Sequence, residues 1–123
     1  TICDITGAGE NHDQRFGKSI RPLIEGKTIK HHDEVYVETF LDGVETRGWA
    51  VIGEKHKYVV YRQFKNAEQL FNLENDPLEM QNLAPVKAYD EIKQEMRAKL
   101  YDWAVKTDDK MLRRVTSNCD DVN

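Results

Sequence analysis

The fold is decided by the stretch Val35-Tyr36-Val37-Glu38-Thr39-Phe40-Leu41-Asp42-Gly43. Its β-branched and aromatic residues favour a strand, and the Asp-Gly pair that follows them is a strong turn signal. Similar strand patterns occur at residues 46–52 and 57–62, and a shorter one occurs at residues 69–73. Because the turns between these strands are too short for parallel crossovers, we expect a four-stranded antiparallel meander.

A long helix is predicted after the strands, from about residue 88 to residue 105. Its apolar residues recur at three- and four-residue steps and so share one stripe, formed by Tyr89, Ile92, Met96, Leu100 and Trp103. Glu95 and Lys99 can pair on the solvated side of this helix. The stripe should cover one face of the sheet, which four short strands alone would leave wet. The predicted class is therefore α+β, with about four antiparallel strands and one long C-terminal helix packed on them.

The segment between the sheet and this helix has the chemistry of a short helical turn. Asp76 can cap it, Pro77 suits its first position, and Glu79 stands where the second residue of a capping box would lie. Pro85 should end the turn. Past Thr107 the residues are polar and acidic, so we expect residues 108–123 to form a loosely held tail.

The first 33 residues have an irregular pattern and little apolar surface to pack together. Ile2 and Ile5 resemble the end of an apolar helix, and a short helix is predicted near Ser19–Gly26, with Ser19 as its cap and Gly26 as its stop. We expect residues 1–33 to be a remnant of a larger domain and a linker. Residues 34–107 would then form the α+β subdomain.

Composition removes several classes of function. The chain has 123 residues and a net charge of −4, with no basic excess and no apolar run long enough to span a bilayer. We therefore expect no nucleic-acid partner and no membrane partner. The two cysteines, Cys3 and Cys119, lie far apart and outside any Cys-x-x-Cys spacing, so neither a zinc site nor a dithiol motif is predicted. A single disulfide between them and two separate thiols both remain open.

No active site assembles from the residue pattern. The cluster His31-His32-Asp33 has metal-ligand residue types, but adjacent histidines point in different directions, so we predict a solvated loop and no metal site. The sequence has no Gly-x-Ser-x-Gly elbow for a nucleophile. Cationic residues are expected around the middle turn, where they could meet an anionic ligand or protect a sheet edge: Arg47, Lys55, His56, Lys57 and Arg62.

Four segments, taken in order, carry a resemblance to a known family. They are Thr1-Ile2-Cys3-Asp4-Ile5-Thr6-Gly7-Ala8, Gly17-Lys18-Ser19-Ile20-Arg21-Pro22-Leu23-Ile24-Glu25-Gly26, Lys57-Tyr58-Val59, and Gln69-Leu70-Phe71-Asn72-Leu73-Glu74-Asn75-Asp76-Pro77-Leu78-Glu79-Met80-Gln81-Asn82-Leu83-Ala84. The last is similar to the pattern Glu-Leu-Tyr-Asp-Leu-x-x-Asp-Pro-x-Glu-x-x-Asn-Leu-Ala. Together they resemble the C-terminal end of arylsulfatase-like sulfatases of the alkaline-phosphatase superfamily.

The resemblance implies that the full-length protein hydrolyses sulfuric esters. Such enzymes use a formylglycine made from the Cys or Ser of a Cys/Ser-x-Pro/Ala-x-Arg motif, and a calcium ion held by Asp and Asn residues. Neither cysteine of this chain fits that motif, because Asp4-Ile5-Thr6 follows Cys3 and Asp120-Asp121-Val122 follows Cys119. We therefore expect an inactive piece with a structural role, no catalytic residues, no metal ligands and no cofactor of its own.

The resemblance also implies a set of partners. The main partner would be the large catalytic domain of the same protein, and the substrate of the whole enzyme would be a sulfated carbohydrate. The exposed docking surface could also form a dimer. The subdomain would border the substrate cleft through His31, His32, Arg47 or His56. The family often has an Arg where Ile52 stands, so no substrate contact is transferred to that position. Family habit places such enzymes in the periplasm, in lysosomes or outside the cell.

Two alternatives stay open at this point. The chain could be a free-standing α+β module that binds a ligand, or it could be the same subdomain of a phosphoester or phosphonate hydrolase. The first predicts that residues 1–26 are ordered by their own contacts. The second differs only in the nucleophile, which this sequence does not contain.

Overall fold

A computed structural model describes residues 1–8, 16–27, 31–40, 46–63 and 67–117. The chain divides into two compact units, Thr1–Asp33 and Glu34–Asn123. In this described part, no helix combines the length and the apolar character that crossing a membrane requires.

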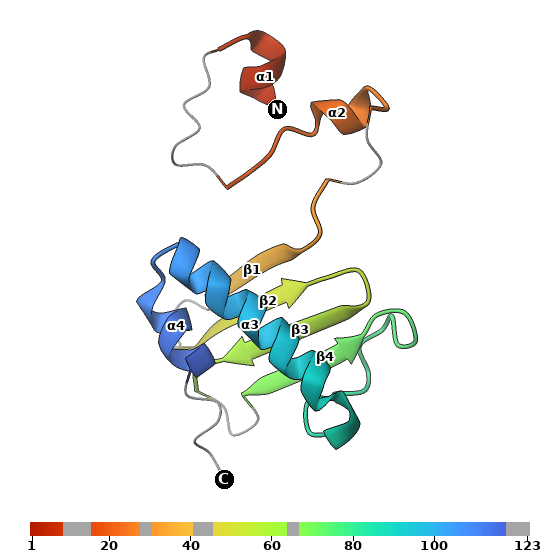
Figure 1. The fold of residues 1–123 in the computed structure, drawn as a ribbon, viewed down its shortest axis with the longest axis vertical. Coiled ribbons are helices and arrows are strands. Elements are labelled where there is room, and N and C mark those ends of the chain that lie inside the picture. The colour runs from red at the N-terminus through yellow and green to blue at the C-terminus, as the bar shows by residue number, and fades with distance from the viewer. Residues whose placement is uncertain (9–15, 28–30, 41–45, 64–66, 118–123) are drawn as a thin grey trace. The chain divides into compact units, whose positions relative to one another are not determined.

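The second unit is built on a four-stranded antiparallel sheet, shown in Figure 1. Its strands follow chain order and are β1 (Val35–Phe40), β2 (Arg47–Ile52), β3 (His56–Tyr61) and β4 (Glu68–Asn72). In the register, Val37 of β1 faces Ala50 of β2, and Ala50 faces Val59 of β3. The predicted meander is confirmed, although the predicted Asp42-Gly43 turn lies outside the described residues.

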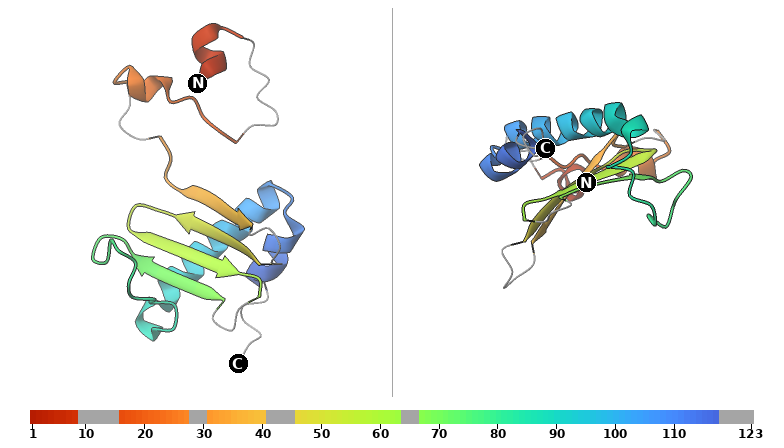
Figure 2. Two further views of the ribbon diagram at one scale, coloured as in Figure 1. Left: turned by 180° about the vertical axis from the view of Figure 1, so that it is seen from behind. Right: turned by 90° about the horizontal axis from the view of Figure 1, so that it is seen from below.

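One long helix covers one face of this sheet. A 3-10 turn, η2 (Lys87–Tyr89), leads into helix α3 (Asp90–Lys106), which crosses the strands in Figure 1 and lies on a single side of them in Figure 2. Met96, Leu100 and Ala104 of α3 are buried against core residues of the sheet, which are Trp49, Val51, Tyr58, Val60 and Leu70. The predicted apolar stripe and the α+β class are therefore confirmed. The predicted pair of Glu95 and Lys99 is also present, with 3.1 Å between carboxylate and ammonium.

The prediction of a loose tail is wrong for residues 110–117, which form helix α4 (Lys110–Ser117). Leu112 is 1% exposed and Thr116 is 5% exposed. Asp109 caps this helix, since its Oδ1 accepts from the backbone N–H groups of Met111 and Leu112 at 3.0 and 2.9 Å. A few apolar residues on one face of a short helix are enough to dock it when a neighbouring helix is present. Cys119 lies outside the described residues.

The prediction of a helical turn after Asp76 is also wrong, because residues 73–86 form a series of turns and bends. The Asp76 carboxylate accepts from the backbone N–H of Gln81 at 2.8 Å, and Glu79 has a left-handed φ of 55°. Glu79 does not reach back as a capping box would, since its carboxylate lies 2.6 Å from the ammonium of Lys57. The local helix signal is overridden by contacts with the sheet.

The first unit contains two short helices, α1 (Ile2–Thr6) and α2 (Arg21–Ile24), and neither has a buried residue. The predicted cap Ser19 lies one residue before the actual N-cap, Ile20, and its Oγ accepts from the backbone N–H of Arg21 at 3.2 Å. Gly26 follows the end of α2 with a φ of 67°, a conformation that only glycine adopts without cost. The predicted short helix is therefore present, although it has no apolar core around it.

Candidate functional site

Two of the four predicted cleft residues, His31 and His32, lie at the end of the first unit. Their rings make an edge-to-face contact, with 4.2 Å between ring centroids. His32 is exposed and His31 is half-buried. A ring N–H of such a pair can donate to an anionic oxygen, but two adjacent histidines do not converge on one metal ion.

The other two, Arg47 and His56, lie in the second unit at opposite ends of the β2–β3 hairpin. Arg47 begins β2 and His56 begins β3, and the two strands run antiparallel. Five residue steps along β2 separate their ends, which is about 17 Å at roughly 3.3 Å for each residue. A single sulfate group cannot contact both side chains at that separation.

The expected cationic cluster around the middle turn is therefore only partly formed. Lys55 and Lys57 lie at that turn, whereas Arg47 and Arg62 lie at the far end of the hairpin, where the Arg62 N–H donates to the Arg47 carbonyl at 3.0 Å. The cations also have acidic neighbours. Lys55 lies 3.6 Å from Glu74, Lys57 lies 2.6 Å from Glu79, and Arg47 lies 3.7 Å from Glu38. These pairs protect the sheet surface and leave less charge for a ligand.

His56 differs from these cations because its Nε2 is buried and has no hydrogen-bond partner in the described part of the chain. It stands two residues before the buried Tyr58 in β3, and residues two apart in a strand share a face, so its side chain belongs to the helix-covered face of the sheet. The orphaned nitrogen is an available donor or acceptor, but it is directed away from open solvent.

A buried polar network, which the sequence pattern does not indicate, joins the long helix to the sheet. Arg97 of α3 donates to the Glu68 carboxylate of β4 from Nη2 at 2.6 Å and from Nε at 3.1 Å. The Tyr58 hydroxyl of β3 donates to the same carboxylate oxygen. One carboxylate thus accepts from three donor groups, on two side chains, that lie near the core.

The network fixes the protonation states of its members. Burial, reinforced by the adjacent Glu68 carboxylate, raises the pKa of Tyr58 well above its usual value. Burial opposes the charge on Arg97, but its bonds to Tyr58 and Glu68 outweigh that effect and raise the pKa of Arg97. The one sequence signal that could have suggested a partly buried pair is that Arg97 stands three and four residues before Leu100 and Tyr101 in the predicted helix. No proton is available from this network near neutral pH, so its role is structural.

The Asn82 side chain explains why the Asp-Pro-x-Glu-x-x-Asn-Leu-Ala segment keeps its shape. Its Oδ1 accepts from the backbone N–H groups of Leu70 and Ala84, both at 3.0 Å, and its Nδ2 donates to the Glu68 carbonyl at 3.3 Å. The Leu83 N–H donates to the Leu70 carbonyl at 2.8 Å, and the Leu83 side chain enters the core. The segment therefore completes the outer edge of β4 and delivers the chain to η2.

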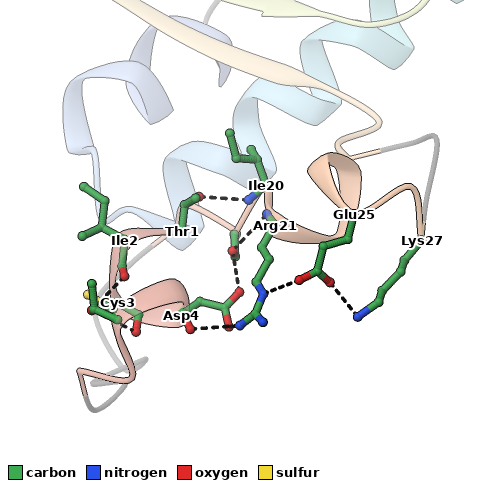
Figure 3. Close-up of polar contacts among 10 residues, drawn as sticks. Thr1, Ile2, Cys3, Asp4, Ile20, Arg21, Glu25 and Lys27 are labelled. Atoms are coloured by element: carbon green, nitrogen blue, oxygen red, sulfur yellow. Dashed lines mark hydrogen bonds and ion pairs between the residues drawn. The ribbon is translucent and has the colours of Figure 1, made fainter.

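The first unit is held by a polar network, drawn in Figure 3. The Asp4 carboxylate accepts from the Ser19 hydroxyl at 2.7 Å and from Arg21 Nη1 at 3.3 Å. Arg21 Nε also donates to Glu25 at 2.6 Å, and Lys27 lies 2.6 Å from the other oxygen of Glu25. The Ser19 hydrogen bond and then the charge of Arg21 hold the pKa of Asp4 below its usual value. This network ties α1 to α2 in place of an apolar core.

A hollow with a volume of about 370 Å³ lies beside the sheet, where β1 and β2 meet the end of α3. Tyr36 and Trp103 stack in its wall, with 4.4 Å between ring centroids, and the Lys106 ammonium lies 5.6 Å from the Trp103 ring. The indole of Trp103 is thus already in contact with two of this chain's own side chains. Among the described residues, no group of three or more His, Cys, Asp or Glu side chains is placed to hold a metal ion.

Three comparisons place this arrangement among known proteins. Residues 1–106 match the family model described as N-sulphoglucosamine sulphohydrolase, C-terminal. Over 112 residues the chain is 34% identical to a Delta 4,5-hexuronate-2-O-sulfatase of Bacteroides thetaiotaomicron (strain VPI-5482). That match covers 89% of this chain and 23% of the relative.

Solved structures agree with the sequence match. A 2-O GAG sulfatase superposes with a TM-score of 0.78 at 33% identity, over 89% of this chain and 24% of that one. A second protein, solved in complex with its substrate D-glucosamine-2-N,6-O-disulfate, superposes with a TM-score of 0.77 at 17% identity, over 89% and 23% of the two chains, and shows the shared fold alone. This chain thus spans about a quarter of the length of these relatives. It belongs to the family of C-terminal domains of N-sulphoglucosamine sulphohydrolase and related sulfatases.

Proposed function

We propose that the full-length protein is a sulfuric ester hydrolase acting on a sulfated carbohydrate, and that this chain is its C-terminal subdomain, with a structural role and no catalytic residues. The observation that carries the proposal is the match of residues 1–106 to the C-terminal sulfatase family. The relatives described above are sulfatases, which favours a sulfuric ester over the phosphoester or phosphonate alternative.

The first unit supports the proposal that a large domain belongs with this chain. Apolar side chains in it are widely exposed, including 78% of Ile2, 59% of Ile5 and 68% of Ile24. Burying one such side chain contributes about 1.5–3 kcal/mol, so a partner that covered all three would add several kcal/mol of stability. The polar contacts of Asp4 with Ser19 and Arg21 are of the kind that a free-standing ligand-binding module predicts for residues 1–26, but such a module would leave these three apolar side chains in water.

The reaction chemistry would come from the part of the protein outside this chain. The described residues hold no cluster for the calcium ion, and the sequence around Cys3 does not fit the formylglycine motif. The residues present therefore do not fit either group, and no step of the hydrolysis is assigned to them. What this chain contributes is the rigid α+β layer, held by the network of Tyr58, Glu68 and Arg97.

The contribution to the substrate cleft is a narrower proposal. His31 and His32 are the best candidates for contact with an anionic sugar, because they are adjacent and at least partly exposed. Arg47 is engaged with Glu38 and lies 5.1 Å from the Phe40 ring centroid, and His56 has its Nε2 buried. If Arg47 or His56 contributes, only one of them can serve the same sulfate group.

The function is tested with the purified full-length protein and a panel of sulfated glycosaminoglycan disaccharides, with released sulfate measured by ion chromatography. We expect sulfate release from at least one disaccharide. A matched phosphate monoester panel is the control. Hydrolysis of phosphate esters with no sulfate release would overturn the proposal in favour of the phosphoester alternative.

The cleft proposal is tested by single substitutions in the same protein: His31→Ala, His32→Ala, Arg47→Ala and His56→Ala. We expect a rise in KM with little change in kcat for the histidine pair. Lys110→Ala, an exposed cation of α4, is the matched control. Unchanged KM values for all four variants on every sulfated substrate would remove the assignment.

A further inference from the structure

Three methionines lie in the second unit, and each has a different environment. Met80 belongs to the turns that follow β4 in Figure 1 and is 81% exposed. Met96 of α3 lies in the core and is 4% exposed. Met111 of α4 is half-buried, and its sulfur accepts from Arg62 Nη1 at 3.8 Å. Solvent therefore reaches the Met80 side chain far more readily than the other two.

The backbone around Met80 is fixed on both sides, although the side chain itself is exposed. On one side, the Glu79 carboxylate lies 2.6 Å from the Lys57 ammonium, and the Glu79 N–H donates to the Asp76 carbonyl at 3.0 Å. On the other side, the Gln81 N–H donates to the Asp76 carboxylate at 2.8 Å. These contacts do not use the Met80 side chain, so a polar atom added to its sulfur leaves them in place.

We propose that Met80 is a modification site, at which peroxides form methionine sulfoxide while the folded core stays intact. A lone pair of the thioether sulfur attacks one peroxide oxygen, so that the S–O bond forms as the O–O bond breaks. The departing hydroxide takes the proton of the transferred oxygen and becomes water. Sulfur is oxidised by two electrons, and the peroxide is reduced by two. A methionine sulfoxide reductase supplied with a thiol reverses the change, giving the thioether, water and a disulfide.

The same oxidation has opposite consequences at Met80 and at Met96. A sulfoxide is polar, and forming one inside a packed core disrupts that core. Met96 is packed among the core residues that hold α3 on the sheet, so its oxidation would loosen the fold. At Met80 the new oxygen stays in water, as does the neighbouring Leu78, which is 80% exposed. Met80 therefore takes up oxidant at a position where the fold tolerates it.

The test treats the full-length protein with hydrogen peroxide and follows each methionine by mass spectrometry. Cleavage after lysine separates the three sites: Met80 falls in residues 66–87, Met96 falls in residues 94–99, and Met111 begins the peptide that follows Lys110. We expect Met80 to gain one oxygen at least about tenfold faster than Met96, and also faster than Met111, because oxidation follows exposure. Methionine sulfoxide reductase with dithiothreitol should remove that oxygen again.

Met80→Leu is the matched control variant. It should abolish the gain of oxygen in residues 66–87 and leave the rates at Met96 and Met111 unchanged. After the same mild treatment, the wild-type protein and this variant should unfold at the same urea concentration. A lower urea midpoint for the treated wild-type protein alone would overturn the claim that oxidation at Met80 spares the core.

A rate at Met80 no greater than the rate at Met96 would overturn the assignment of the site, since another part of the protein would then cover this side chain. The inference does not depend on the proposed function, because the oxidation requires no sulfatase activity. Preferential oxidation of Met80 in a protein that releases no sulfate would support the modification site while the proposed function fails.

Discussion

Arg97→Met removes the link between the long helix and the sheet at nearly constant side-chain volume. The Arg97 and Glu68 side chains are 11% and 20% exposed, with 2.6 Å between Nη2 and the carboxylate. Removing one partner of a fully buried pair costs about 3–5 kcal/mol, and removing one partner of an exposed pair costs about 0–1 kcal/mol. Because this pair is closer to the buried limit, we expect the free energy of unfolding to fall by about 3 kcal/mol.

A double-mutant cycle measures this coupling directly. Arg97→Met, Glu68→Gln and the double variant are unfolded in urea and followed by tryptophan fluorescence, since both tryptophans, Trp49 and Trp103, lie in the second unit. We expect an interaction energy of about 2 kcal/mol, within the range for residues in direct contact.

Lys99→Met is the matched control, because Lys99 lies on the same helix and pairs with more exposed carboxylates, among them a 66% exposed Glu95. We expect it to cost less than about 1 kcal/mol. If Arg97→Met costs no more than Lys99→Met and the cycle shows a coupling below about 0.5 kcal/mol, the view that the buried network holds the helix on the sheet is refuted.

Three further predictions follow from single contacts. Because the pKa of Tyr58 is raised in the folded state, the unfolded chain loses this proton first as the pH rises. The contribution of Tyr58 to the free energy of unfolding is therefore fully present below about pH 10 and falls by about 1.4 kcal/mol for each pH unit above it. Tyr58→Phe should remove that slope in urea titrations, and an unchanged slope would contradict the assignment. Leu112→Ala should cost about 3 kcal/mol by urea unfolding, because the residue is 1% exposed, whereas a cost near zero would return α4 to a loose tail. Gly48→Ala should cost about 1–3 kcal/mol, because the new Cβ meets the Tyr61 ring at 2.7 Å; Tyr61→Leu in the same chain should restore most of it, and a lack of restoration would argue for a backbone cause.

The parts of the fold that depend on repeating patterns could be predicted from the sequence. Alternation in Val35–Phe40 and in the three later strands is read from neighbouring residues alone, and the stripe through Met96 and Leu100 is read from helical spacing. Short turns between strands then leave the antiparallel meander as the simple topology. The family resemblance added the expectation of a larger partner, which periodicity does not contain.

The parts that depend on distant contacts could not be predicted. Helix α4 looks polar in sequence, and it forms because Asp109 caps it and also accepts from the Trp49 indole N–H at 3.2 Å, sixty positions away. The segment after Asp76 has helix-start chemistry. The hydrogen bond from Leu70 to Asn82 and the ion pair of Glu79 with Lys57 instead hold it in turns against the sheet. The expected cationic cluster is only partly formed for a similar reason. Lys55 and Lys57 lie at the turn of the hairpin, whereas Arg47 and Arg62 lie at its other end.

The most direct test of the central claim is the sequence of the reading frame that precedes Thr1. We predict an upstream catalytic domain that contains a Cys/Ser-x-Pro/Ala-x-Arg motif and paired acidic metal ligands. A frame that begins close to Thr1, or an upstream domain with a threonine nucleophile and no such motif, would contradict the assignment of this chain to the C-terminal end of a sulfatase enzyme.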